Sequence, residues 1–199
     1  MIDILSKITE EIKKDMEKVW FIADIHAYHD KIISICNRPC RPENHEEWLL
    51  NQINHYVKKN DRLYILGDVS IANKIKTEKF LDKINGIKYL IVGNHDKNID
   101  KSTRFENISD IKDFTYSRGE INIHIVLCHY PIVSWNRKIH GSWHLYGHVH
   151  GRFNMPNLSL DVGIDNETHK YPYNLYEICQ IMEEKSKKHN YKVEDSSTF

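Results

Sequence analysis

The chain has 199 residues, 40% of them hydrophobic, and this length fits one compact domain with a sizeable core. Its 28 basic residues balance 28 acidic ones, so no global positive field exists to hold duplex nucleic acid. No apolar run reaches the roughly 20 residues that a membrane-crossing helix needs, and the chain opens on a charged, periodic segment. We expect a globular cytoplasmic protein with no membrane partner, either a monomer or a homodimer.

In the first half, strand-like and helix-like segments alternate. We predict an amphipathic helix over 1–18, a strand over 19–23, a helix over 46–57, a strand over 63–66, a helix around 80–84 that closes at Asn85-Gly86, and a strand over 87–92. The N-terminal helix either packs on the domain or pairs two subunits. Alternation of this kind favours a mainly parallel sheet with helices outside, and the carboxyl ends of such strands collect ligands.

The second half has a different pattern, which favours an antiparallel or mixed sheet. Apolar and polar residues alternate cleanly over 121–128, and further short strands are expected near Leu145 and Leu158. Asn174 is a candidate cap for a last helix. The segment 97–109 lacks periodicity and suggests a mobile cap over a site. The predicted organisation is a main domain over 19–183 and a charged, flexible tail over 184–199.

The cysteines do not indicate a metal site of their own. Cys36 and Cys40 are four residues apart with no second pair downstream, so core or surface thiols are the preferred interpretation. Cys128 lies beside His129 but belongs to an apolar strand, which favours a packed thiol over a nucleophile. We therefore expect reduced cysteines.

The loops that follow the predicted strands carry side chains suited to metal binding. The candidate ligands are Asp24, His26, Asp68, Asn94, His129, His148 and His150. Carboxylate, amide and imidazole donors without thiolate suit Mn, Fe or Zn. Seven donors exceed the needs of one tetrahedral ion but fit two ions that share a carboxylate. Such a pair keeps a positive charge for an incoming anion, and phosphate esters are natural substrates for it.

Five ordered blocks resemble the signature of the calcineurin-like metallophosphoesterases. They are Asp24-Ile25-His26, Gly67-Asp68, Gly93-Asn94-His95-Asp96, His129 and Gly147-His148-Val149-His150. The resemblance spans roughly 19–164 and implies an α/β (α+β) fold, a two-sheet β-sandwich flanked by helices. It also implies two divalent ions, with Mn²⁺ expected first and Fe, Zn, Ni or Co as alternatives. Asp24, His26 and His150 would hold one ion, Asn94, His129 and His148 the other, and Asp68 would bridge them.

The same resemblance implies a hydrolytic mechanism. A hydroxide between the metals would attack phosphorus in line. His95 would protonate the departing oxygen or stabilise the phosphorane charge, and Asp96 would orient His95. A leaving-group histidine favours phosphodiesters over monoesters. The expected substrate is a small phosphorylated molecule, with nucleotides and short nucleic acids among the candidates.

Three further residues are candidates for substrate binding, namely Arg152, His29 and Arg38. Arg152 follows the last histidine block. An isolated arginine can bind phosphate, although it is more often a surface residue without a ligand. His29 and the segment Cys36-Asn37-Arg38-Pro39 resemble the sequences of a small bacterial and phage subgroup of uncharacterised phosphoesterases. The remaining histidines have no partner at motif spacing and are expected to be solvated or in the core.

Three rival functions stay open on sequence alone. The first is a non-catalytic, metal-binding interaction scaffold of the same fold; some relatives of that fold serve as scaffolds after losing metal ligands, and the intact ligands here argue against this function. The second is a nuclease: one that acts on long polymers is expected to have a basic stripe with interleaved aromatic residues, and the neutral charge argues against it but is compatible with short or single-stranded substrates. A hydrolase with one zinc ion would leave Asn94 and one histidine block without a role.

Overall fold

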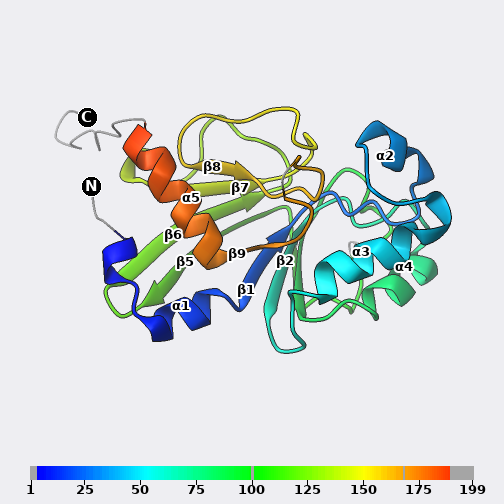
Figure 1. Ribbon diagram of the computed structural model, residues 1–199, viewed down its shortest axis with the longest axis horizontal. Helices are drawn as coiled ribbons and strands as arrows, with labels where there is room; N and C mark the ends of the chain where they lie inside the picture. Colours follow the sequence, from blue (N-terminus) through cyan, green and yellow to red (C-terminus); the bar gives the residue numbers. More distant parts are fainter. Residues whose placement is uncertain (1–3, 100, 168, 189–199) are drawn as a thin grey trace.

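Two mixed β-sheets packed against each other form the centre of the molecule, and helices flank them (Figure 1). The computed structural model describes residues 4–99, 101–167 and 169–188. The first sheet has the strand order β4-β3-β2-β1-β9 and the second the order β5-β6-β7-β8. The predicted α/β class with two sheets and flanking helices is confirmed at this level.

The first sheet is parallel except at one edge. Its strands are β1 (Val19–Ile22), β2 (Arg62–Leu66), β3 (Ile87–Ile91), β4 (Asn107–Ser109) and β9 (Tyr173–Asn174). Strands β1 to β4 pair in parallel, and β9 pairs antiparallel with β1. These four strands therefore point their carboxyl ends toward the same edge, as the alternating pattern predicted for β1, β2 and β3.

The second sheet is mixed. Its strands are β5 (Ile111–Arg118), β6 (Ile121–Cys128), β7 (Trp143–Tyr146) and β8 (Ser159–Asp161). A hairpin joins β5 to β6, whereas β6, β7 and β8 run parallel to one another. The residue pattern predicted β6, β7 and β8 but not β5. In β5 the lower-exposure side chains of Phe114 and Tyr116 alternate with polar neighbours, so its apolar signal is weak.

Strand alternation divides the first sheet between two cores. Phe21 and Leu66 face the second sheet and pack in one cluster with Ile123 and Leu145. Neighbouring side chains such as Ile22 point to the opposite face, where a second cluster forms under helices. Both faces are therefore covered, which explains why these strands read as continuous apolar runs.

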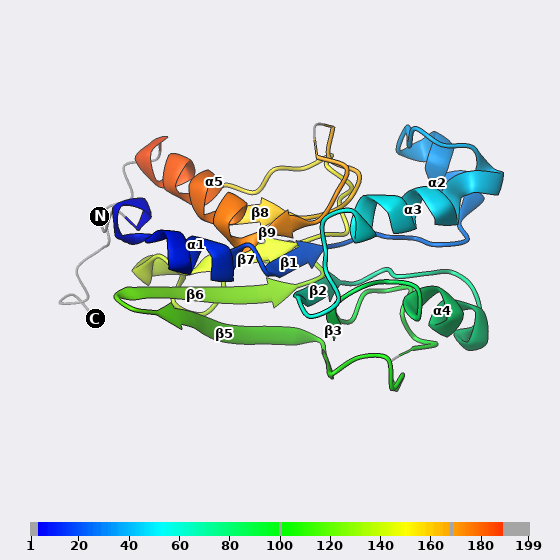
Figure 2. The ribbon, with the colours of Figure 1, turned by 60° about the horizontal axis from the view of Figure 1, so that its bottom comes forward.

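Helices complete both cores. They are α1 (Glu10–Met16), α2 (Asp30–Ile35), α3 (His45–Asn54), α4 (Lys74–Leu81) and α5 (Leu175–Lys188), with 3-10 turns at Leu5–Lys7, Pro42–Asn44 and Lys138–His140. Helices α3 and α4 cover the outer face of the first sheet, while α1 and α5 lie side by side at the other end (Figure 2). Asn174 and Glu177 exchange side-chain to backbone hydrogen bonds of 2.9 Å, so the predicted cap of α5 is confirmed.

Three segments differ from prediction. The helix expected over 1–18 is broken, because Ile8 is extended and the Thr9 side chain caps a new helix from Glu10. Residues 184–188 belong to α5 rather than to a tail, and 189–199 lie outside the described residues. The segment 97–109 is no cap over a site, since Ile99 and Phe105 are buried in the core and β4 joins the sheet.

No helix among residues 4–99, 101–167 and 169–188 combines the length and the apolarity required to span a membrane.

Candidate metal centre

Strand ends bring the seven predicted ligands together. Asp24 and His26 follow β1, Asp68 follows β2 and Asn94 follows β3. His129 follows β6, and His148 and His150 follow β7 in the second sheet. Because β1, β2 and β3 are parallel, and β6 and β7 likewise, each sheet delivers its polar loops at one edge.

The first group comprises Asp24, His26 and His150, one candidate ligand atom of each lying within 4.8 Å of the others. His26 is only 2% exposed, yet among the described residues neither of its ring nitrogens has a hydrogen-bond partner. Burial, followed by the neighbouring His150, lowers the pKa of His26 to about 2, so the ring is neutral with a lone pair to offer. A buried polar side chain of this kind needs a partner.

The second group comprises Asp68, His129 and His148, again within 4.8 Å. His129 Nδ1 lies 2.8 Å from the carbonyl of Leu66 and donates its proton there. Its Nε2 therefore carries a lone pair, and that atom lies 3.1 Å from Oδ1 of Asn94. The same oxygen of Asn94 lies 3.1 Å from Nδ1 of His148. Asn94 thus joins this group, because its Oδ1 lies close to ring nitrogens of both His129 and His148.

Asp68 lies between the two groups. Its Oδ2 is 3.4 Å from His26 Nε2 in the first group and 3.6 Å from His129 Nε2 in the second. Its Oδ1 accepts a hydrogen bond of 2.9 Å from the backbone amide of His95. One oxygen is therefore fixed by the backbone, and the other faces both imidazoles.

Five of the seven residues have a left-handed backbone. The φ angles are 57° for Asp24, 49° for His26, 56° for Asp68, 72° for His148 and 51° for His150. Each such residue other than glycine costs of the order of 1–3 kcal/mol, and such strain concentrates at functional sites. The surrounding fold must therefore hold these five side chains in place against local preference.

Two glycines allow the loops to approach closely. A Cβ built on Gly93 would overlap the carboxylate and backbone of Asp68. A Cβ on Gly147 would overlap Ala23 and lie 2.8 Å from Oδ2 of Asp24. Gly93 and Gly147 therefore allow their loops to approach the carboxylates of Asp68 and Asp24, which lie in loops after other strands.

The first group is short of positive charge. Burial, followed by the carboxylates of Asp161 and Asp68, raises the pKa of Asp24 well above its usual range, despite a hydrogen bond from the backbone amide of His148. Burial similarly raises the pKa of Asp161. Buried carboxylates beside a neutral histidine form a site that a cation would complete. The donor set and the unpartnered His26 both fit a divalent metal.

His95 and Asp96 have different surroundings. His95 is exposed, and its ring centroid lies 5.3 Å from that of His26, so it borders the two groups. Asp96 is buried, and its oxygens accept hydrogen bonds of 2.8–2.9 Å from the amides of Asp68, Val69 and Gly93. Among the described residues no hydrogen bond joins Asp96 to the His95 ring. The expectation that Asp96 orients this ring is therefore corrected: Asp96 ties the β2 and β3 loops together.

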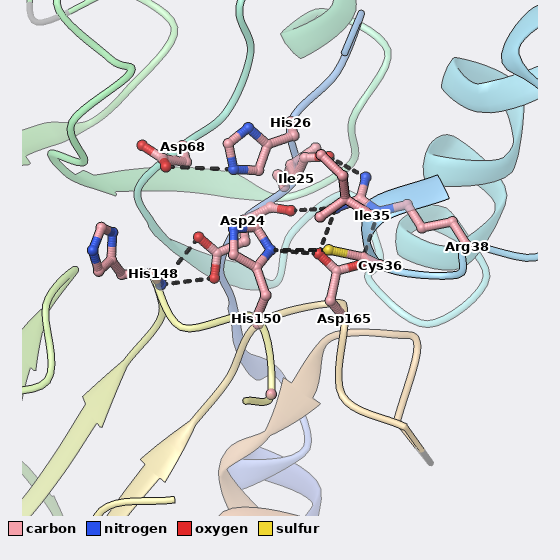
Figure 3. A network of polar contacts seen from close by, with 12 residues as sticks. Asp24, Ile25, His26, Ile35, Cys36, Arg38, Asp68, His148, His150 and Asp165 are labelled. Carbon is pink, nitrogen blue, oxygen red and sulfur yellow. Dashed lines mark hydrogen bonds and ion pairs between the residues drawn. The ribbon is translucent and has the colours of Figure 1, made fainter. Parts of the chain in front are cut away.

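Arg38 is not placed to bind substrate, contrary to prediction. It is 4% exposed and uses all five donors (Figure 3). Nε and Nη2 bond both oxygens of Asp165 at 2.8 and 2.9 Å, and Nη2 also reaches the carbonyl of Asp24 at 2.7 Å. Nη1 bonds the carbonyl of Ile25 and Nε2 of His45 at 2.7 and 2.8 Å. No donor remains for a phosphate.

The other two substrate candidates keep a place near the site. His29 is partly buried, its ring centroid is 5.4 Å from that of His26, and its Nδ1 has no hydrogen-bond partner among the described residues. Burial, followed by the neighbouring His95, lowers the pKa of His29. Arg152 is exposed and donates a hydrogen bond of 3.2 Å to the carbonyl of Ile35.

Sequence reasoning missed Asp161 and Asp165, which lie at the end of β8 and in the loop after it. Asp161 accepts hydrogen bonds of 2.8 Å from the amides of Gly151 and Gly163, which joins the last histidine block to this loop. Asp165 accepts from Nδ1 of His150 at 2.7 Å. The signal in the sequence was an aspartate, a glycine and a second aspartate directly after a predicted strand.

Comparison with protein-family models gives no match to the chain. The uncharacterized protein MJ1445 of Methanocaldococcus jannaschii is 30% identical over 178 residues, which are 84% of this chain and 93% of the relative. The gene 66 protein of Mycobacterium phage L5 is 26% identical over 181 residues, 75% of this chain and 87% of the relative. A crystal structure of the Aquifex aeolicus protein of unknown function AQ665 has a TM-score of 0.62 at 24% identity, covering 82% of this chain and 98% of that one. That likeness shows a shared fold.

Proposed function

The chain belongs to the family of the uncharacterized archaeal protein MJ1445, and we propose that it is a dinuclear, metal-dependent phosphoesterase of the calcineurin-like metallophosphoesterase type. Its reaction would be hydrolysis of phosphate esters, with phosphodiesters preferred to monoesters. The two packed sheets with polar loops at strand ends support the proposal that the fold is the β-sandwich of that superfamily.

The single observation that carries this proposal is the position of His26. Its ring is buried and neutral and lacks a hydrogen-bond partner among the described residues, and it lies between Asp24, His150 and Asp68. A buried polar group without a partner costs about 1–3 kcal/mol. A left-handed backbone at His26 adds to that cost. A bound cation would offset both, and a purely structural role leaves them unexplained.

Each group of residues would hold one ion. Asp24, His26 and His150 would bind the first, Asn94, His129 and His148 the second, and Asp68 would contact both. The oxygen and imidazole donors suit Mn²⁺, Fe, Zn, Ni or Co, and we expect Mn²⁺ to support activity. When bound, the ions would neutralise phosphate oxygens and provide a nucleophile from water at neutral pH.

The chain's own residues would position the substrate and handle its leaving group. His95 is exposed beside the first group and its backbone amide is fixed by Asp68, so its ring can donate a proton to a departing oxygen. The ring centroid of His29 lies 5.4 Å from that of His26, and its unpartnered Nδ1 could form a hydrogen bond with a substrate oxygen. Arg152 offers a guanidinium at the surface for an anionic group.

The test combines metal content with turnover. Purified protein is loaded with Mn²⁺, desalted and examined by elemental analysis, and hydrolysis of bis-p-nitrophenyl phosphate is followed with and without chelator. We expect close to two ions per chain and turnover that chelator abolishes. Two ions without turnover on any phosphate ester would favour the metal-binding scaffold, and no metal with no turnover would refute the proposal.

A further inference from the structure

We propose that Arg38 and Asp165 are positioning residues for the first metal position, acting through His150. The inference rests on the proposed function but adds two residues to it. Arg38 holds Asp165, and Asp165 holds the Nδ1 side of the His150 ring (Figure 3). We call these three residues the relay.

The contact between Asp165 and His150 selects the state of the ring. Oδ2 of Asp165 is 2.7 Å from Nδ1 of His150, so the Nδ1 proton is donated to the carboxylate. The Nε2 atom then carries the lone pair, and a carboxylate behind a ligating histidine raises its basicity and fixes its orientation. The His150 ring also stacks on His26, with centroids 5.1 Å apart and planes at 26°. Tautomer and orientation are therefore both set before an ion binds.

Arg38 pairs with Asp165 in a buried place. Both side chains of this pair are fully buried. Two guanidinium nitrogens of Arg38 lie 2.8 and 2.9 Å from the two carboxylate oxygens of Asp165, so each buried group has a partner of opposite charge. Arg38 also binds the backbone carbonyls of Asp24 and Ile25, so one guanidinium fixes the loop that carries two ligands as well as the carboxylate behind a third.

The second metal position has no equivalent arrangement among the described residues. Behind His129 stands the neutral carbonyl of Leu66, at 2.8 Å from Nδ1. His148 is exposed, and its Nδ1 faces Asn94. A substitution in the relay should therefore weaken the binding of the ion at the first position and leave binding at the second position unchanged. A general loss of structure would weaken both.

Cys36 touches the relay without being essential to it. Its Sγ is 3.6 Å from Nδ1 of His150, and burial, followed by Asp165, raises the pKa of this thiol to about 11. The thiol therefore stays protonated at neutral pH and lies against a carboxylate that already has three nitrogen donors. We assign no separate metal site to Cys36.

The test measures ion binding in two variants and a control. Asp165→Asn keeps the shape of the side chain but removes its charge, and the double variant Arg38→Met with Asp165→Asn removes both members of the buried pair. Asp82→Asn is the matched control, because Arg104 bonds both oxygens of Asp82 in the same way on the surface. Metal-free proteins are titrated with Co²⁺ while the visible spectrum and the bound ions per chain are recorded.

We expect wild type and Asp82→Asn to bind two Co²⁺ ions. Both relay variants should bind one ion with wild-type affinity and the other about 10–100-fold more weakly, the usual loss when a residue behind a metal ligand is changed. If Asp165→Asn fails to fold, the double variant, which leaves no unpaired buried charge, decides the question. If a folded relay variant binds two ions with unchanged affinity, the positioning role of Arg38 and Asp165 is wrong while the proposed function stands. If the wild type binds no metal, both the proposed function and the positioning role are wrong.

Discussion

Oδ2 of Asp68 lies 3.4 Å from Nε2 of His26. The same oxygen is 3.6 Å from Nε2 of His129, so a single carboxylate oxygen faces both ligand groups. Asp68→Asn can keep the acceptor oxygen for the amide of His95, but it removes the negative charge and places an NH₂ group where Oδ2 faces the two imidazoles. We expect this variant to lose bound Mn²⁺ and turnover together, measured by elemental analysis and by hydrolysis of bis-p-nitrophenyl phosphate.

The control for this prediction is Asp110→Asn, since Asp110 is exposed and outside both ligand groups. It should retain two ions and full activity. Full activity in Asp68→Asn would contradict the shared carboxylate.

His95→Asn should separate chemistry from metal binding. His95 is exposed and is absent from both groups of candidate ligands, although its ring borders His26. We expect two ions to remain and kcat to fall by about 10²–10⁴-fold, the usual contribution of a general acid. His140→Asn, at another exposed histidine, serves as the control. Loss of an ion in His95→Asn would instead make His95 a metal ligand.

Residue pattern predicted the parts of the fold where alternation and apolar runs are strong. Strand β6 was predicted over 121–128, the residues it occupies, because it alternates without interruption. Strand β5 was missed because its inward side chains are widely mixed with polar ones. The N-terminal helix was predicted too long because periodicity continues through Ile8 and Thr9, where a turn and a cap interrupt the backbone.

The candidate site was predicted in the same uneven way. The seven proposed ligands converge because each follows a strand end, and strand ends are visible in sequence. Partners behind the ligands are not visible, because they depend on which loops meet across the two sheets. Arg38 was therefore assigned to substrate although it is buried against Asp165, and Asp96 was assigned to His95 although it bonds backbone amides.

Asp96→Asn should act mainly on stability. The carboxylate accepts three backbone hydrogen bonds, and an asparagine would place an NH₂ group against amide donors. A buried donor left without an acceptor costs about 1–3 kcal/mol. We expect thermal unfolding of the metal-free variant to shift down by about 2–4 °C for each kcal/mol lost. An unchanged Tm with a large fall in kcat would restore a catalytic role for Asp96.

Diesters should be better substrates than monoesters. The alkoxide that leaves a diester departs slowly unless it is protonated, and the exposed His95 ring is placed to donate that proton. The measurement compares kcat/KM for a phosphodiester and a phosphomonoester that release the same aliphatic alcohol, in the Mn²⁺-loaded protein. Faster turnover of the monoester would contradict the preference while leaving the phosphoesterase proposal intact.

Asp24→Asn should stabilise the metal-free protein while it abolishes the first metal position. Burial, followed by Asp161 and Asp68, raises the pKa of Asp24 well above the ordinary value of 3.8. A raised pKa means that the unfolded chain ionises this group more readily than the fold does, so the penalty is absent below the ordinary pKa and grows as pH rises toward the folded pKa.

The variant keeps an acceptor oxygen for the amide of His148 and carries no charge. We therefore expect its Tm without metal to exceed that of wild type at pH 8 by at least about 2–4 °C, which corresponds to about 1 kcal/mol, and the gap to narrow toward pH 5. Added Mn²⁺ should reverse the order, because a ligand stabilises only the fold that binds it. A wild-type protein that stays more stable than Asp24→Asn without metal at every pH would show that the protein itself satisfies the buried carboxylate, so that this position needs no cation.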